Sequence, residues 1–343
     1  MSPTPVLEIR LNNESIIFNG TNTESAGAVL QGILYLNLSE SIKLRSVELR
    51  FEGKMRVCWD EVPGLKHHSR LETRNLLSHT WKFFESTKKS AILEAGEYEY
   101  PFEIGIPGNL PETVCTEYGQ IRYKLKGVLT RPTFCTNYQV EKELSIQRFL
   151  SPNLNFHEPV TIAETWNDKL AYEVYISSKT FGPNENINIL LHVLQLSSDI
   201  QLKKVSCLLK EYTYYRVPGK NRNKLQTRWV ARDSITSFRP DEDERHSWEG
   251  VISMGIPSFG EVHSDCRTEW IQVRHKLKCK IEFRVNDSTK AVYVSVPIMI
   301  SSGSSQQLLT TLPRYEESSP DRVLSPINLD PPTYDTLFLS GIQ

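Results

Sequence analysis

Apolar and polar residues alternate one by one along much of this chain, which is the period of a β-strand with one buried face. In the stretch SVELRFEG, Val47, Leu49 and Phe51 share one face, and charged residues occupy the positions between them. The same alternation recurs in IRYKLKGVLT, NINILLHVLQL and WIQVRHKLKCKIEF, whereas no stretch keeps a helical period. Strands of this kind bury one face and expose the other, as antiparallel sandwiches do. The pattern therefore predicts an all-β protein.

The chain is long enough for two domains, since 343 residues can form two separate cores of ordinary size. Prolines and turn-forming residues interrupt the alternation between residues 148 and 168. From residue 303 to 343 there are five prolines, six serines and only short apolar clusters, a composition typical of a disordered tail. We predict a first domain over 1–150, a connection over 151–165, a second domain over 166–302 and a disordered tail over 303–343.

Charge, termini and cysteines exclude several classes of protein. A formal net charge of −1 argues against a globally basic nucleic-acid binder, and we predict no nucleic-acid partner. The first residues, MSPTPVLEIRLNNESII, lack the features of a signal peptide, and the longest apolar run, AVYVSVPIMI, is too short to cross a membrane. The six cysteines show no C-x-x-C spacing. We expect a reduced, cytoplasmic protein, and an extracellular adhesion sandwich conflicts with these features.

The sequence contains no signature of catalysis that we recognise. The patterns G-x-S-x-G, H-E-x-x-H and G-x-x-x-x-G-K-[ST] do not occur, so we predict that the protein is not an enzyme and has no cofactor. His263, Cys266, His275 and Cys279 have a spacing that suggests zinc. However, His275 and Cys279 fall on the apolar face of a predicted strand, which favours packing in a core. We therefore predict no metal site.

One segment is strongly basic. Residues 203–232 contain nine Lys and Arg residues and one acid, a formal charge of +8. Clustered cations attract anionic lipid headgroups or acidic peptides. We predict such a role for Lys220, Arg222, Lys224 and Arg228, with a solvated hairpin as the alternative.

The tail contains a motif that indicates a partner. In PPTY, Pro331 and Pro332 favour an extended polyproline II conformation, which WW domains bind in an aromatic groove, and Tyr334 is placed to fill a neighbouring pocket. A second candidate, LPRY, provides Leu312, Pro313 and Tyr315. Two serines that precede proline, Ser319 and Ser325, are candidate phosphorylation sites.

Six segments, in the right order, resemble the arrestin fold. They are AGAVLQGILYLNLSESIKLRSVELRFEGK, LEAGEYEYPFEIGIPGNLPET and YGQIRYKLKGVLTRP in the first half, and SKTFGPNENINILLHV, WIQVRHKLKCKIEF and VSVPIMI in the second. The resemblance covers about residues 5–302. With the proline–tyrosine motifs in its tail, the chain resembles the alpha-arrestins, which are the arrestin-related trafficking adaptors.

This resemblance implies two arrestin-like, immunoglobulin-like β-sandwiches in tandem. It implies a WW-domain HECT-type ubiquitin ligase as a partner of the proline–tyrosine motifs and integral membrane proteins, transporters or receptors, as cargo. The protein would promote ubiquitination, endocytosis and sorting of that cargo, and would be recruited from the cytoplasm to the plasma membrane and endosomes. The alternative is a trafficking scaffold or receptor-binding protein that shares the arrestin fold and recruits no ligase.

Overall fold

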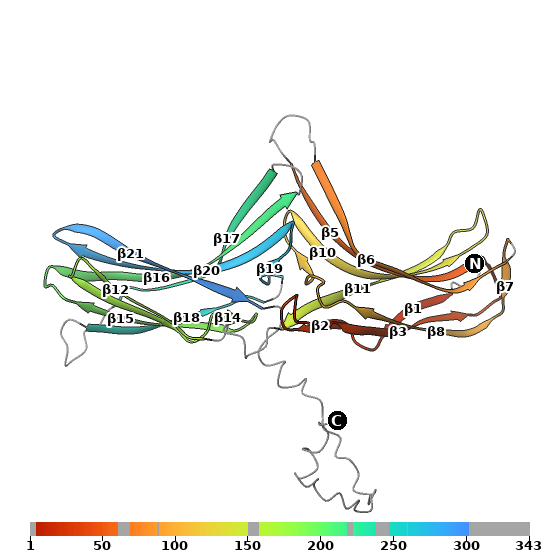
Figure 1. Cartoon of the computed structure of the whole chain (residues 1–343), viewed down its shortest axis with the longest axis horizontal. Coiled ribbons are helices and arrows are strands. Elements are labelled where there is room, and N and C mark those ends of the chain that lie inside the picture. The colour runs from red at the N-terminus through yellow and green to blue at the C-terminus, as the bar shows by residue number, and fades with distance from the viewer. Residues whose placement is uncertain are drawn as a thin grey trace, which may run out of the picture. The chain divides into compact units, whose positions relative to one another are not determined.

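The structure, a computed structural model, describes residues 5–60, 69–87, 89–149, 158–217, 222–237, 247–258 and 260–301. Every regular element in these ranges is a β-strand, and the predicted all-β class is confirmed (Figure 1). Within the same ranges we find no helix that is long and apolar enough to span a membrane. The predicted tail with its proline–tyrosine motifs and Ser319 and Ser325 lies outside the described residues.

The first sandwich pairs a three-stranded sheet with a larger one. The smaller sheet has the order β1 (Val6–Leu11), β3 (Ala28–Leu38) and β8 (Gly96–Ile106). The larger has the order β2 (Ser15–Asn19), β11 (Tyr138–Phe149), β10 (Gly119–Thr130), β5 (Ser46–Asp60) and β6 (Ser69–Glu85), with β9 (Val114–Cys115) beside β10. The short strands β4 (Ile42–Leu44) and β7 (Ala91–Leu93) form a separate pair.

The second sandwich repeats this plan. Its four-stranded sheet has the order β12 (Val160–Trp166), β13 (Leu170–Ile176), β15 (Asn186–Gln195) and β18 (Ser247–Gly255). The facing sheet has the order β14 (Thr180–Phe181), β21 (Ser288–Ile300), β20 (Ile271–Val285), β16 (Ile200–Val217) and β17 (Arg222–Ile235), with β19 (Cys266–Arg267) beside β20. Both larger sheets contain one parallel pair, β2 with β11 and β14 with β21.

Alternation in the sequence explains which residues form the cores. Val47, Leu49 and Phe51 on β5 are fully buried, and the apolar positions of β10, β15 and β20 are buried in the same way. Because successive side chains of a strand point to opposite faces, the residues between them form the outer faces of the sheets. Which side chains are neighbours on each outer face is therefore set by strand register.

The two sandwiches contact each other through residues of β10, β16 and β20. The rings of Tyr118 and Tyr215 meet edge to face at 5.6 Å, and Tyr215 and Ile271 belong to the same buried cluster as the first core. Gly119 of β10 packs against Ile271 and Tyr215 of the second sandwich, and a Cβ added at this glycine would lie 2.8 Å from Ile271 Cδ1. Strand β11 ends at Phe149, just before the predicted connection over 151–165. Strand β12 runs from Val160 to Trp166, so the last part of that predicted connection is a strand of the second sandwich.

Candidate functional site

The outer face of the second sandwich collects cations from three neighbouring strands. Register places Lys210 of β16 opposite Lys276 of β20, and Leu208 of β16 between Lys278 of β20 and Arg232 of β17. With further members on the same face, these residues form what we call the cationic face: Lys204, Lys210, Arg232, Arg274, Lys276, Lys278 and Lys280. At its centre Tyr212 has the ammonium groups of Lys210, Lys276 and Lys278 at 5.4, 5.9 and 6.0 Å from its ring centroid.

Few of these cations have an acidic partner in the part of the chain that the structure describes. Lys280 pairs with Glu282 at 2.6 Å, but among the described residues we find no carboxylate paired with Lys210, Lys276 or Lys278. The corresponding sheet of the first sandwich differs, because its cations are neutralised. There Lys124 and Lys126 of β10 pair with Glu141 at 3.2 and 2.8 Å. The cationic face is thus a local excess of positive charge on a chain that is nearly neutral overall.

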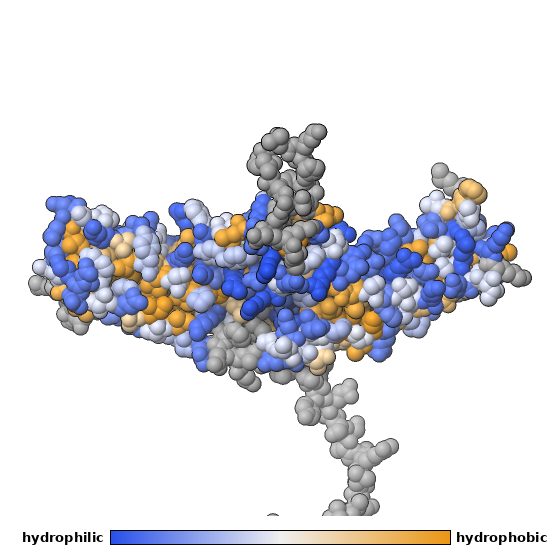
Figure 2. Space-filling model, turned by 45° about the horizontal axis from the view of Figure 1, so that its top comes forward, coloured by the Kyte–Doolittle hydropathy of each residue, from blue (hydrophilic) through white to orange (hydrophobic). Residues whose placement is uncertain are grey.

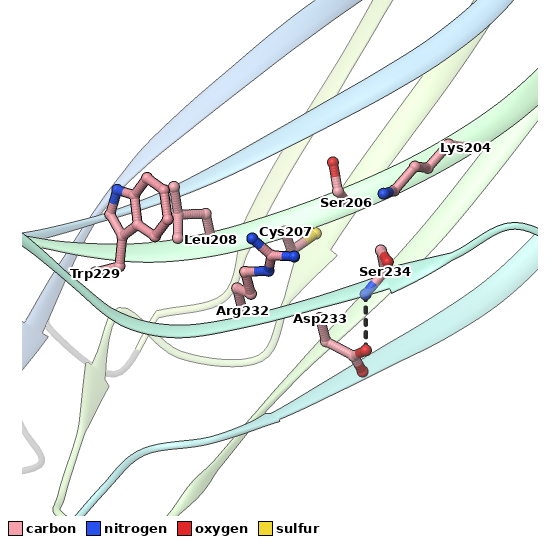
Figure 3. Close-up of a pocket in the computed structure, with 8 residues that line it drawn as sticks. All are labelled: Lys204, Ser206, Cys207, Leu208, Trp229, Arg232, Asp233 and Ser234. Atoms are coloured by element: carbon pink, nitrogen blue, oxygen red, sulfur yellow. Dashed lines mark hydrogen bonds between the residues drawn. The ribbon is translucent and has the colours of Figure 1, made fainter.

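The edge of the cationic face also exposes apolar side chains and a small cavity. Trp229 is 67% exposed and Leu225 is 52% exposed, both on β17. Figure 2, in which the layer with β16, β20 and β21 comes forward, shows hydrophilic and apolar residues interspersed on the visible face. An open cavity of about 190 Å³ lies over β16 and β17 (Figure 3). Its lining includes two cations, a carboxylate, two hydroxyl groups and an indole, with the buried Cys207 at its border: Lys204, Arg232, Asp233, Ser206, Ser234 and Trp229.

Beneath this face lies a buried polar cluster around Glu211 of β16, which we call the Glu211 cluster. Arg228 binds the Glu211 carboxylate through two nitrogens, at 2.7 and 2.8 Å. His263 Nδ1 lies 2.8 Å from the same carboxylate, and His275 Nε2 lies 3.2 Å from it. The other ring nitrogen of His275, Nδ1, lies 2.6 Å from Asp265 Oδ1, which also accepts a hydrogen bond from the backbone N–H of Ile300.

The contacts of His275 define its charge. Both ring nitrogens face carboxylate oxygens, and only the doubly protonated imidazolium can donate to both. Burial lowers the pKa of His275, but its hydrogen bonds to Asp265 and Glu211 outweigh burial, so the pKa is raised. Burial raises the pKa of Glu211, yet the hydrogen bonds from His263, His275 and Arg228 dominate and the pKa is lowered. Burial raises the pKa of Asp265.

The raised pKa of His275 gives a prediction about pH. A histidine whose pKa is higher in the folded state stabilises the fold fully below its unfolded value, 6.5, and this stabilisation is lost as pH rises through the folded value. We expect the melting temperature of the wild type to exceed that of His275→Gln most at pH 6, with the difference shrinking toward pH 9. Thermal scans of both proteins across this range test it. A difference that grows with pH would contradict the assignment of a charged His275.

The structure divides the predicted anion-binding residues between different environments. Lys220 and the side chain of Arg222 lie outside the described residues. Arg228 belongs to the Glu211 cluster, and Lys224 Nζ lies 3.5 Å from the ring centroid of Tyr118. Both cations therefore have partners inside the protein, and anion binding by these four residues stays a prediction.

The four residues with the zinc-like spacing do not converge on one point in the structure. His263 and His275 converge on Glu211, whereas Cys279 faces Cys207 and the Cys266 thiol lies 4.0 Å from the carbonyl oxygen of Ile271. His275 and Cys279 are buried, as their place on the apolar face of a strand predicts. No group of three metal-ligating side chains with a suitable arrangement occurs among the described residues.

Sequence reasoning missed Glu211 and the lysines of β20 as parts of a site. Glu211 has the same phase as Leu209 and Tyr215, both fully buried, so a carboxylate at that position signals a buried partner. Lys276 and Lys278 alternate with core residues, so the sequence pattern alone indicates only the exposed side of a strand. Their convergence with Lys210 depends on the pairing of β16 with β20.

Comparison with known proteins identifies the class to which two such tandem sandwiches belong. The family model for the N-terminal domain of arrestin (or S-antigen) matches residues 8–153, and the model for the C-terminal domain matches residues 166–307. The chain belongs to the arrestin family, as the six segments of the sequence predict.

Several curated relatives agree with this assignment. An arrestin domain-containing protein of Schizosaccharomyces pombe is 29% identical over 82% of this chain and 49% of its own length. A second protein of that yeast is 26% identical over 85% of this chain and 53% of its own length. Its name gives it a proposed role as an arrestin-related trafficking adapter. The HECT-type ubiquitin ligase-interacting protein creD of Emericella nidulans is 26% identical over 80% of this chain and 49% of its own. The chain spans about half the length of these relatives.

Proposed function

We propose that this protein is a non-catalytic adaptor that brings a WW-domain HECT-type ubiquitin ligase to integral membrane cargo. The observation that carries the proposal is the PPTY sequence at residues 331–334, in a chain whose preceding part has the arrestin fold. The name of the relative creD, a HECT-type ubiquitin ligase-interacting protein, supports it. The adaptor would act at the cytoplasmic side of the plasma membrane and of endosomes, where ubiquitination of a transporter or receptor promotes its endocytosis and sorting.

A binding experiment tests ligase recruitment. The full chain is expected to retain a tandem WW protein from a HECT-type ligase in a pull-down, and the chain that lacks residues 303–343 is expected to lose it. The double change Ser319→Ala and Ser325→Ala serves as a matched tail control, because it alters the same segment outside both motifs. Equal retention with and without the tail would favour the alternative of an arrestin-fold scaffold that recruits no ligase.

We further propose that the cationic face binds the anionic cytoplasmic surface of a membrane. Support comes from the cations on three adjacent strands for which the described residues provide no acidic partner. Trp229 adds to it, because aromatic side chains favour the membrane interface. Each Lys or Arg near an anionic bilayer contributes about 1 kcal/mol. A flat sheet face can bring several of them to a bilayer at once.

Charge reversal tests the cationic face. We expect the triple change Arg232→Glu, Lys276→Glu and Lys278→Glu to weaken sedimentation with phosphatidylserine vesicles roughly 100-fold, since about 3 kcal/mol is lost. Three cations of the first sandwich that have acidic partners provide a matched control with the same change in net charge: Arg122→Glu, Lys124→Glu and Lys126→Glu.

If vesicle binding falls equally in both triple variants, the loss is due to the change in net charge and not to the position of the cations on the cationic face. Vesicle binding that is unchanged, together with lost binding to a polyglutamate peptide, would assign the face to acidic proteins and contradict a membrane role. The measurements belong at low salt, where exposed charges are screened least.

A further inference from the structure

Two buried cysteines face each other across neighbouring strands of the second sandwich. Cys207 of β16 and Cys279 of β20 are direct partners in the antiparallel register, and each is 1% exposed. Their Sγ atoms lie 2.9 Å apart. A disulfide joins sulfurs at about 2.05 Å and needs Cβ atoms about 3.5–4.5 Å apart. Directly opposed strand residues have Cβ atoms about 4.5–5.5 Å apart, so a small shift of the two strands closes the bond.

The pair is separate from the other described thiols. The third buried cysteine, Cys266, lies against the carbonyl oxygen of Ile271. Cys115 and Cys135 are exposed, and Cys58 is partly exposed. Cys207 also belongs to the lining of the open cavity over β16 and β17, beside Ser206 and Ser234 (Figure 3). Both side chains belong to the buried core of the second sandwich, so a small neutral oxidant reaches the pair through local opening of the strands beside this cavity.

The environment makes this pair slow to react at rest. The hydrogen bond between Cys207 and Cys279 and the burial of Cys207 raise the pKa of the Cys207 thiol. The protonated form of this thiol therefore predominates near neutral pH. Only the thiolate attacks an oxidant rapidly. Cys207 and Cys279 consequently stay reduced under ordinary cytoplasmic conditions, and abundant oxidant or a higher pH is needed to convert them.

We propose that Cys207 and Cys279 form a redox site that closes to a cross-strand disulfide on exposure to a peroxide. The Cys207 sulfur attacks one oxygen of hydrogen peroxide, the O–O bond breaks, and the departing hydroxide takes up the thiol proton as water. The Cys279 thiol then attacks the resulting sulfenic sulfur, the S–S bond forms, and the hydroxyl group leaves with the second thiol proton as another water. Two electrons pass from the sulfurs to the peroxide. Two molecules of a thiol reductant reverse the step by exchange.

The bond would cross-link the two central strands of the cationic face. β16 carries Lys210 and Glu211, and β20 carries Lys276 and His275, whose contacts all depend on this register. A disulfide between residues 72 positions apart also restricts the unfolded chain. Oxidation would therefore stabilise the second sandwich and hold the cationic face in one arrangement.

Mass spectrometry on the full chain tests the proposal. Cys58, Cys115 and Cys135 are first replaced by serine, which leaves the three buried cysteines unchanged. Hydrogen peroxide treatment is expected to lower the intact mass by two hydrogen atoms. The oxidised protein is then unfolded and alkylated with iodoacetamide. We also expect a 207–279 cross-linked peptide, alkylation at Cys266 only, and a higher melting temperature that dithiothreitol reverses.

Controls separate this result from general thiol oxidation. In the same background, Cys266→Ala is expected to leave the cross-link unchanged, and Cys279→Ala is expected to abolish both the cross-link and the rise in melting temperature. Alkylation of both Cys207 and Cys279 after peroxide treatment would overturn the proposal. So would their separate conversion to sulfinic acids without a bond, or a cross-link that involves Cys266.

Discussion

Replacing Glu211 by alanine is expected to lower the melting temperature by roughly 10 °C. The carboxylate is buried and accepts hydrogen bonds from Arg228 and from His263 and His275. Removing one partner of a buried ion pair costs about 3–5 kcal/mol, because the other charges remain without compensation. For domains of this size each kcal/mol corresponds to about 2–4 °C. Thermal unfolding followed by circular dichroism measures the shift.

A surface carboxylate in the same sheet provides the matched control. Glu282 of β20 pairs with Lys280 at 2.6 Å, and the two side chains are 23% and 37% exposed. Exposed or partly exposed pairs contribute about 0–1 kcal/mol, so Glu282→Ala is expected to shift the melting temperature by a few degrees at most. Equal shifts for Glu211→Ala and Glu282→Ala would show that the Glu211 cluster contributes no more than a surface pair.

Changing Tyr334 to alanine is expected to reduce binding to a tandem WW protein more than changing Tyr315, and the double change is expected to abolish it. PPTY has both prolines, whereas LPRY has one. The tyrosines are 19 positions apart. If the segment is a flexible coil, as the composition of the tail predicts, that length spans about 24 Å on average and about 60 Å when fully extended, enough for two adjacent WW domains. Once one motif is bound, linkage increases avidity by about 100-fold or more.

A single isolated WW domain distinguishes bivalent from single binding. Against that domain Tyr315→Ala should matter little, because the stronger PPTY motif is intact. Against the tandem protein the same change should lower the affinity clearly. Titration calorimetry of both variants with both WW proteins gives the comparison. The same small effect of Tyr315→Ala on both would leave PPTY as the sole contact with the ligase.

The fold could be predicted from the sequence because period-two alternation directly records which face of each strand is buried. Leu49 and Phe51 are fully buried at the positions the pattern assigns to the core, and Ile189 and Ile281 behave in the same way. The order of the strands in each sheet does not follow from this pattern, because neighbours in a sheet can be distant in the chain. The family resemblance predicted two tandem sandwiches, and the structure gives the order of their strands.

The site was harder to predict because it depends on register. Glu211 and His275 are 64 positions apart, and only the pairing of β16 with β20 brings them together. The basic segment 203–232 also looked like one group of cations in the sequence. Strand alternation divides it, so that Arg228 turns inward to Glu211 while Lys210 and Arg232 remain on the outer face. A count of charges along the chain cannot distinguish cations that point inward from cations that lie on the outer face.

The attachment of β21 has a mechanical consequence for any partner that pulls on the residues beyond it. β21 lies between β14 and β20, and its last residues are held from both sides. Ile300 exchanges hydrogen bonds with Asp265, and the Ser301 N–H donates to the carbonyl oxygen of Phe181. Because the hydrogen bonds of an antiparallel pair are perpendicular to the strands, tension along β21 acts on them in shear and is shared among them. Force applied to the residues beyond β21 therefore has to break its hydrogen bonds to β14 and β20 together before the strand detaches from the sheet.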